Sequence, residues 1–157
     1  MRKFTDANGR EWEVSIDCAS IGRVYDQCGV DLGDPNDGEI PLYVRIMSGF
    51  GLLLKVLPVV CFPQINVRGL NTESFLSSIP NKGLLKLRDD FVQEWSDFFQ
   101  SSGQVTASRM LTAMKQYQDA KTKMDPNSPE VKKLEALLLT VSQAPLESAT
   151  TSPESVG

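Results

Sequence analysis

The stretch Leu42–Phe62, LYVRIMSGFGLLLKVLPVVCF, is the most apolar part of this 157-residue chain and lies between two more polar halves. It is long enough to cross a bilayer. However, Arg45, Lys55 and Pro58 interrupt it, and a charge in the middle of a bilayer is energetically costly. The stretch is therefore predicted to form core helices rather than a membrane span.

Local breakers divide this apolar stretch into two helices. Pro41 suits the start of a first helix over about Leu42–Met47, because proline fits the first turn of a helix. Ser48-Gly49 can end that helix. A second helix is expected from Phe50, which Pro58 should kink or end, with Pro63 closing the run.

The segment Lys3–Ile16, near the N-terminus, is predicted to form a β-hairpin. Its turn, Asp6-Ala7-Asn8-Gly9, fits a type I turn with Gly9 in the left-handed conformation and a bulge. A two-residue turn is the competing arrangement, and it would set Phe4 against a glutamate. The bulged turn instead sets Phe4 opposite Trp12 on one apolar face, so the alternating pattern favours it. An isolated hairpin is marginal in water, so this face should dock on the helices.

Apolar residues at helical spacing predict several more helices. The first follows Asp17 as its cap and ends at Gly29, whereas Gln64–Gly69 reads as a polar connection. The later helices are expected at Glu73–Ile79 with Asn71 or Thr72 as cap, from Leu84 to Phe99 before Ser102-Gly103, at Val105–Met124, and from Ser128 through Val141.

The predicted fold class is mainly α: an N-terminal β-hairpin at about 3–16, a bundle of five to six helices and a disordered C-terminal tail. Three regions are expected. A hairpin and helical core domain covers 1–101, a helical extension covers 102–141, and a tail covers 142–157. The tail is rich in Ser, Thr, Pro and Glu and has little apolar surface to bury.

The composition restricts the function. A formal net charge of −4 argues against nucleic-acid or acidic-membrane binding, since both need a concentrated basic face. Histidine is absent, which removes the usual general base and the commonest nitrogen ligand of metals. Cys18 and Cys28 are about 15 Å apart on one helix, too far for a disulfide, and no C-x-x-C pair suggests zinc. Reduced thiols and a charged N-terminus without a signal peptide predict a cytoplasmic protein.

No catalytic, cofactor-binding or metal-binding residue is predicted. Asp89 and Asp90 are adjacent on a helix and point about 100° apart, so their carboxylates do not converge. The acids Asp31, Asp34 and Asp37 lack the spacing of a calcium loop. These acids are interpreted as solvated turn and helix-face residues.

Aromatic residues of the helix that starts at Leu84 form a stripe that is ordinarily core. A sharper interpretation is that the stripe forms a groove for a partner helix or a contact between copies, because the helices carry more apolar faces than one small core needs. The candidate partner-binding residues are Phe91, Trp95, Phe98, Phe99, Met110, Met114 and Tyr117.

Several segments together resemble small proteins of tailed-phage and prophage gene clusters, described as tail assembly chaperone-like. In that family a hairpin F-T-D-x-x-G-R-x-W precedes R-V-x-x-x-x-G-V-D-L, an apolar helix ending in P-Q, and a helix ending in F-F. Pro58 and the extension after Gly103 depart from the pattern. The matching segments are KFTDANGREWEV (3–14), IGRVYDQCGVDL (21–32), VVCFPQ (59–64), GLNTESFLSSI (69–79) and LRDDFVQEWSDFF (87–99).

The resemblance implies a non-enzymatic role in the cytoplasm of a bacterial host. Tail assembly chaperones bind the long helical tape measure protein, keep it soluble, help to recruit tail tube subunits and leave before the virion is complete. The expected partners are therefore the tape measure protein and/or tail tube protein, with a homo-oligomer left open. The alternative is a structural virion or head–tail connector protein. The resemblance assigns no functional role to any single residue.

Overall fold

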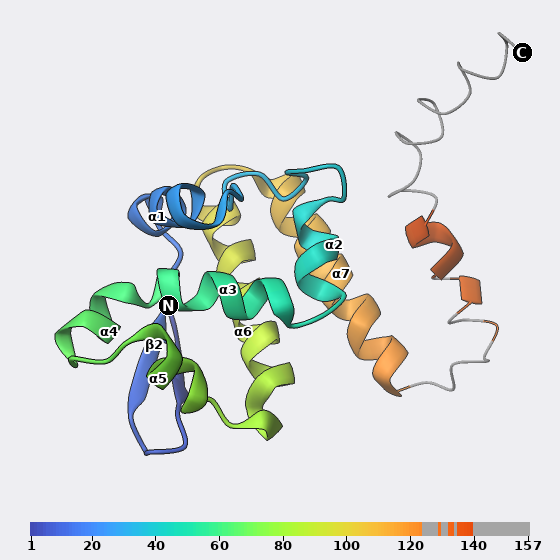
Figure 1. Cartoon of the computed structure of the whole chain (residues 1–157). Coiled ribbons are helices and arrows are strands. Elements are labelled where there is room, and N and C mark those ends of the chain that lie inside the picture. The colour runs from blue at the N-terminus through green and yellow to red at the C-terminus, as the bar shows by residue number, and fades with distance from the viewer. Residues whose placement is uncertain (124–128, 130–131, 134, 140–157) are drawn as a thin grey trace, which may run out of the picture. The chain divides into compact units, whose positions relative to one another are not determined.

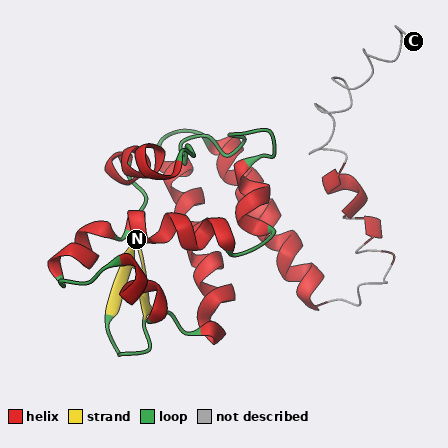
Figure 2. Cartoon of the chain, viewed as in Figure 1, coloured by secondary structure: helices red, strands yellow, loops and turns green. Residues whose placement is uncertain are grey.

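The computed structural model describes residues 1–123, 129, 132–133 and 135–139. The described chain is mainly helical, with a two-stranded antiparallel hairpin at its N-terminus, which confirms the expected fold class (Figures 1 and 2). It divides into two compact units, 1–115 and 116–157. The first unit takes in the start of the helix beyond Gly103. It consists of two strands, seven α-helices and one 3-10 helix: β1 (Arg2–Thr5), β2 (Glu11–Val14), α1 (Cys18–Cys28), α2 (Leu42–Met47), α3 (Gly51–Val60), α4 (Phe62–Val67), α5 (Thr72–Ser77), η1 (Asn81–Gly83), α6 (Leu84–Ser101) and the first part of α7 (Val105–Lys123).

The hairpin adopts the bulged turn. Gly9 has a left-handed φ of 77°, and its N–H donates to the carbonyl of Asp6 at 3.1 Å. Phe4 lies directly opposite Trp12. The predicted register is thus confirmed, and the aromatic face turns towards the helices.

Helix α1 begins and ends where its capping residues predict. The side chain of Asp17 accepts a hydrogen bond from the N–H of Ser20, whose hydroxyl in turn accepts from the N–H of Asp17, forming a capping box. Gly29 ends the helix at a φ of 69°, a conformation that costs other residues a steric penalty.

Helix α3 forms the centre of the core, as expected for the apolar stretch. Leu53, Val56 and Leu57 are fully buried, and α3 packs against α1. The helix continues past Pro58 and ends at Val60, so the proline lies in its last turn. No helix in the described residues combines the length and the apolar character needed to cross a membrane.

The interpretation of Gln64–Gly69 as a polar connection was wrong. Residues Phe62–Val67 form α4, a short helix with Pro63 in its first turn and Ile65 buried. Proline is compatible with a first turn because the N–H that it lacks has no partner there anyway.

The cap of the next helix, α5, was expected to be Asn71 or Thr72. The structure shows that Asn71 is the cap, because its side chain accepts a hydrogen bond from the N–H of Ser74 at 2.7 Å.

Helix α6 is the longest helix of the core, and α7 attaches to it through small polar groups. The hydroxyl of Ser96 lies 2.8 Å from that of Ser108, and Leu111 of α7 is fully buried.

Further along the chain, residues 132–133 and 135–139 are helical. The remainder of the helix expected up to Val141, and the expected tail from residue 142, lie outside the described residues.

Candidate functional site

Most of the aromatic stripe expected to bind a partner is core instead. Phe91, Trp95 and Phe99 are fully buried, and Met114 is buried. The indole N–H of Trp95 donates to the carbonyl of Leu32 at 2.7 Å, which ties α6 to the loop after α1. These four side chains are therefore enclosed by this chain's own residues, and the expectation that they offer a binding surface is corrected.

The other three candidates keep some exposed surface. Phe98 and Met110 are half-buried in the first unit, and Tyr117 is half-buried in the second. Met110 lines a hollow of about 490 Å³ between the loop after α1 and the start of α7, together with Pro35 and Val105. For these three residues, partner binding stays a prediction.

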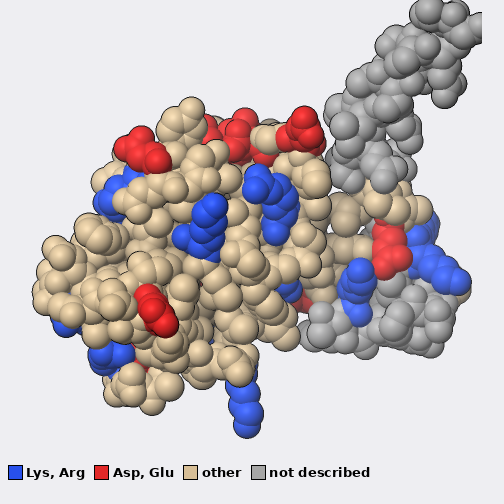
Figure 3. Space-filling model, viewed as in Figure 1, with Lys and Arg blue, Asp and Glu red and all other residues tan. Residues whose placement is uncertain are grey.

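The acids of the loop after α1 shape its turns. The carboxylate of Asp31 accepts from the N–H of Gly33, that of Asp34 from the N–H of Asn36, and that of Asp37 from the N–H of Asp31. Figure 3 shows acidic side chains gathered along the side of the first unit where α1 and this loop lie. Within the described residues no three acidic, cysteine or histidine side chains cluster closely enough to hold a metal ion.

A buried carboxylate organises the hairpin. Asp6 has a side chain with no exposed surface, and it accepts four hydrogen bonds. Its Oδ1 accepts from the N–H of Asn8 and the N–H of Arg10, both at 2.9 Å. Its Oδ2 accepts from Nε of Arg10 at 2.8 Å and from Nε1 of Trp12 at 2.9 Å. Burial alone would raise the pKa of Asp6, but these hydrogen bonds outweigh it and hold the pKa well below its ordinary value.

The inner face of the hairpin docks on α5 through aromatic rings. Phe75 is fully buried, and its ring centre lies 4.7 Å from that of Trp12 in an edge-to-face arrangement. The ring centre of Phe4 lies 6.3 Å from that of Phe75. This geometry is the preferred one for aromatic pairs. The hairpin thus gains the apolar support that two strands lack alone.

Helix α4 covers the outer edge of β2 with side chains. The amide of Gln64 accepts from the N–H of Glu13 at 2.9 Å and donates to its carbonyl at 2.7 Å. Arg68 donates to the carbonyl of Glu11 at 2.6 Å, and its guanidinium lies 4.3 Å from the ring centre of Trp12. These side chains supply the hydrogen bonds that a third strand would make.

Replacing Gln64 with alanine should therefore lower the free energy of unfolding by about 1.5 kcal/mol, because it removes both hydrogen bonds to Glu13. Amide hydrogen exchange at Glu13 should also become faster. Gln27→Ala, at an exposed position of α1, is the matched control and should change stability by less than about 0.5 kcal/mol. We call the pair of hydrogen bonds between Gln64 and Glu13 the Gln64 clamp. Equal effects of the two substitutions in urea denaturation would show that the Gln64 clamp does not stabilise the fold.

The thiol of Cys61 lies behind this clamp. It is buried, and its Sγ lies 3.7 Å from the carbonyl of Glu13. Burial raises the pKa of Cys61 to about 12, so the group stays a neutral thiol at ordinary pH. Cys61 is therefore a packing residue of this site.

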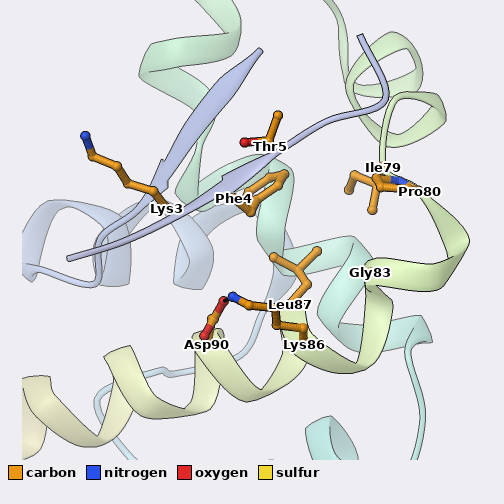
Figure 4. Close-up of a pocket in the computed structure, with 9 residues that line it drawn as sticks. All are labelled: Lys3, Phe4, Thr5, Ile79, Pro80, Gly83, Lys86, Leu87 and Asp90. Carbon is orange, nitrogen blue, oxygen red and sulfur yellow. Dashed lines mark hydrogen bonds and ion pairs between the residues drawn. The ribbon is translucent and has the colours of Figure 1, made fainter. Parts of the chain in front are cut away.

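A groove lies beside β1, on the side of the hairpin away from α4. It has a volume of about 290 Å³, and β1 lies on one side with the turn before α6 and α6 itself on the other (Figure 4). We call it the β1 groove. Its lining residues are Lys3, Phe4, Thr5, Ile79, Pro80, Gly83, Lys86, Leu87 and Asp90.

No family model, curated protein or solved structure matches this chain. The interpretation of the site therefore depends on its geometry. Sequence reasoning did not identify the Gln64 clamp or the β1 groove. The Pro63-Gln64 pair that follows the apolar stretch was visible in the sequence, but Glu13, to which Gln64 bonds, lies about fifty residues earlier in the chain.

Proposed function

We propose that this chain is a non-enzymatic protein-binding module of the tail assembly chaperone-like type, acting in the cytoplasm of a bacterial host. Its client is the tape measure protein of a phage or prophage tail and/or the tail tube subunit. The proposal starts from the sequence segments that resemble this family.

One observation carries the proposal: the matching segments form one interlocked unit. Asp6 and Trp12 from the hairpin segment bond to each other, and Phe75 from a later segment packs on Trp12. Gln64, which ends the P-Q segment, clamps β2. Segments scattered over the sequence thus build one docked hairpin, so the residues that carry the resemblance are also residues that hold this fold together.

The arrangement also suits binding of a protein. The docked hairpin presents a groove with apolar side chains on its floor and charged residues on its rim. Apolar anchors inside a polar rim are the usual anatomy of a protein interface. A chaperone also needs only moderate affinity, since it must release its client. A small groove buries little surface of the client, which is typical of weak or transient protein complexes.

Co-expression tests this function. The chain is produced in bacteria together with the tape measure protein encoded in the same gene cluster, and the soluble fraction is compared with that of the client alone. We expect the client to become soluble and to co-purify with the chain. An unrelated small acidic helical protein serves as the control. A client that stays insoluble, with no complex formed, would contradict the proposal.

Mass spectrometry of purified virions separates this function from that of a structural connector. A chaperone leaves before the particle is complete, so the chain should be absent from particles while present in the infected cell. Its presence in mature particles at the level of other structural proteins would establish the connector function instead.

A further inference from the structure

Asn8 and Gly9 form the only Asn-Gly pair in the sequence, and both are exposed in the turn of the hairpin. The residue after an asparagine controls how readily that asparagine deamidates, because its main-chain nitrogen is the nucleophile that attacks the carboxamide. A side chain on that residue hinders the approach, and glycine has none. An exposed Asn-Gly pair is therefore the arrangement in which an asparagine is chemically least stable.

The carboxamide of Asn8 is free to react. Among the described residues, Asn8 contributes only its main-chain N–H to a hydrogen bond, which Oδ1 of Asp6 accepts at 2.9 Å. A β-carbon added at Gly9 would meet no heavy atom of the described chain within 4 Å, apart from the neighbouring residues. The two reacting groups are therefore open to water.

One hydrogen bond holds the nucleophile in place. The N–H of Gly9 donates to the carbonyl of Asp6 at 3.1 Å, and the nitrogen must leave this bond before it can attack. The carbonyl of the same peptide unit, that of Asn8, accepts no hydrogen bond from the described residues, so rotation of this unit breaks only the one bond. A single hydrogen bond has a small net free energy, so the fold should slow the reaction about threefold to tenfold without stopping it.

The reaction needs only water. The nitrogen of Gly9 attacks Cγ of Asn8 and loses its proton, and the side-chain nitrogen of Asn8 leaves as ammonia, so that a succinimide ring forms. Water then opens the ring at one of its two carbonyl carbons. Opening at the side-chain carbonyl gives an aspartate, whereas opening at the main-chain carbonyl gives an isoaspartate, in which the main chain runs through the side-chain carbon.

Both products disturb the hydrogen bonds around Asp6. Either product places a new carboxylate on the residue whose N–H bonds to Oδ1 of Asp6, and two carboxylates so close in one turn repel each other. Isoaspartate also adds one carbon to the main chain between Asp6 and Arg10, whose N–H donates to the same oxygen at 2.9 Å. The longer turn no longer fits the carboxylate that organises it.

We propose that Asn8 is a site of spontaneous deamidation in the folded chain and that its isoaspartate product loosens the β-hairpin. The exposed glycine permits the reaction, and the dependence of the turn on Asp6 converts it into a loss of structure. The inference concerns the chemical lifetime of the hairpin and is independent of the proposed client.

The first measurement follows the full chain as it ages in mildly alkaline buffer, because base removes the proton of the attacking nitrogen. Trypsin cleaves after Lys3 and Arg10 and releases the fragment 4–10, in which Asn8 is the only asparagine. Mass spectrometry of this fragment, against an unaged sample, measures the conversion, and chromatography separates the aspartate and isoaspartate forms. We expect conversion about threefold to tenfold slower than in a synthetic peptide of the same sequence.

Two controls test whether the Asn-Gly pair is responsible. Asn66 is also exposed but precedes the β-branched Val67, so the tryptic fragment 56–68 should stay unchanged over the same time. Asn8→Gln keeps a carboxamide but must close a larger ring to react, so its fragment 4–10 should convert at least about tenfold more slowly.

The second measurement tests the structural consequence. The converted chain carries one extra negative charge, so ion exchange separates it from the unconverted chain. We expect amide hydrogen exchange in β1 and β2 of the converted chain to become about threefold to tenfold faster, with exchange in α3 unchanged. Asn8→Asp adds the charge without the extra main-chain carbon and should show a smaller increase.

Three results would overturn the proposal. The first is an unchanged Asn8 in the folded chain after the synthetic peptide has converted completely, which would show that the turn does not open. The second is conversion of Asn66 as fast as that of Asn8. The third is a converted chain whose hairpin exchanges at the rate of the unconverted chain, which would show that the turn tolerates the extra carbon.

Discussion

Replacing Phe75 with alanine should lower the free energy of unfolding by about 4 kcal/mol, a large effect for one substitution in a chain of this size. Phe75 is fully buried and lies under both hairpin aromatics, Phe4 and Trp12. The substitution removes the buried area of the ring, leaves a cavity and loses two aromatic contacts. The hairpin depends on this support, so the effect should be strongest there.

Urea denaturation followed by tryptophan fluorescence measures this change, because Trp12 touches Phe75. Native-state hydrogen exchange should show the amides of β1 and β2 losing protection more than those of α3. Phe62→Ala is the matched control: Phe62 is 47% exposed, so its loss should cost less than about 1 kcal/mol. If both substitutions cost the same, Phe75 is not the support of the hairpin.

The hairpin and the capped helices could be predicted from the sequence because their signals are local. The turn residues Asp6 and Gly9 fixed the loop, and the alternation of Phe4 and Trp12 fixed the register. Asp17 and Gly29 likewise marked both ends of α1. Each of these signals acts over a few residues, so tertiary contacts had little scope to override it.

The site could not be predicted because its contacts join distant segments. The Gln64 clamp depends on where α4 lies against β2, and the polar stretch Gln64–Gly69, which directly follows Pro63, reads as a loop when taken alone. Which edge of the hairpin α4 covers is therefore a tertiary property.

The aromatic stripe illustrates a different limit. Periodicity identifies an apolar helix face but does not identify what covers it. The indole of Trp95 donates to the carbonyl of Leu32, so a loop of the same chain covers the stripe that was expected to face a partner. An excess of apolar faces was therefore weak evidence for an interface, because the loop after α1 and the start of α7 account for this one.

Replacing Asp6 with asparagine should lower the free energy of unfolding by about 3 kcal/mol at neutral pH. Each carboxylate oxygen of Asp6 accepts two hydrogen bonds, and an amide retains only one oxygen. Its NH₂ group must therefore face two donors, either the two main-chain N–H groups or the side chains of Arg10 and Trp12. Asp26→Asn, which removes an exposed carboxylate from α1, is the control and should stay within about 0.5 kcal/mol.

The same carboxylate should give the fold an acid-sensitive component. The pKa of Asp6 is lower in the folded chain than in the unfolded chain, where it is about 3.9, so the unfolded state takes up the proton more readily. The stabilisation is therefore complete well above pH 4 and is lost as the pH falls towards the folded value. The difference in unfolding free energy between the unsubstituted chain and Asp6→Asn should shrink between about pH 5 and pH 2. Urea denaturation over this range measures it, and a difference that stays constant would show that ionised Asp6 does not hold the hairpin together.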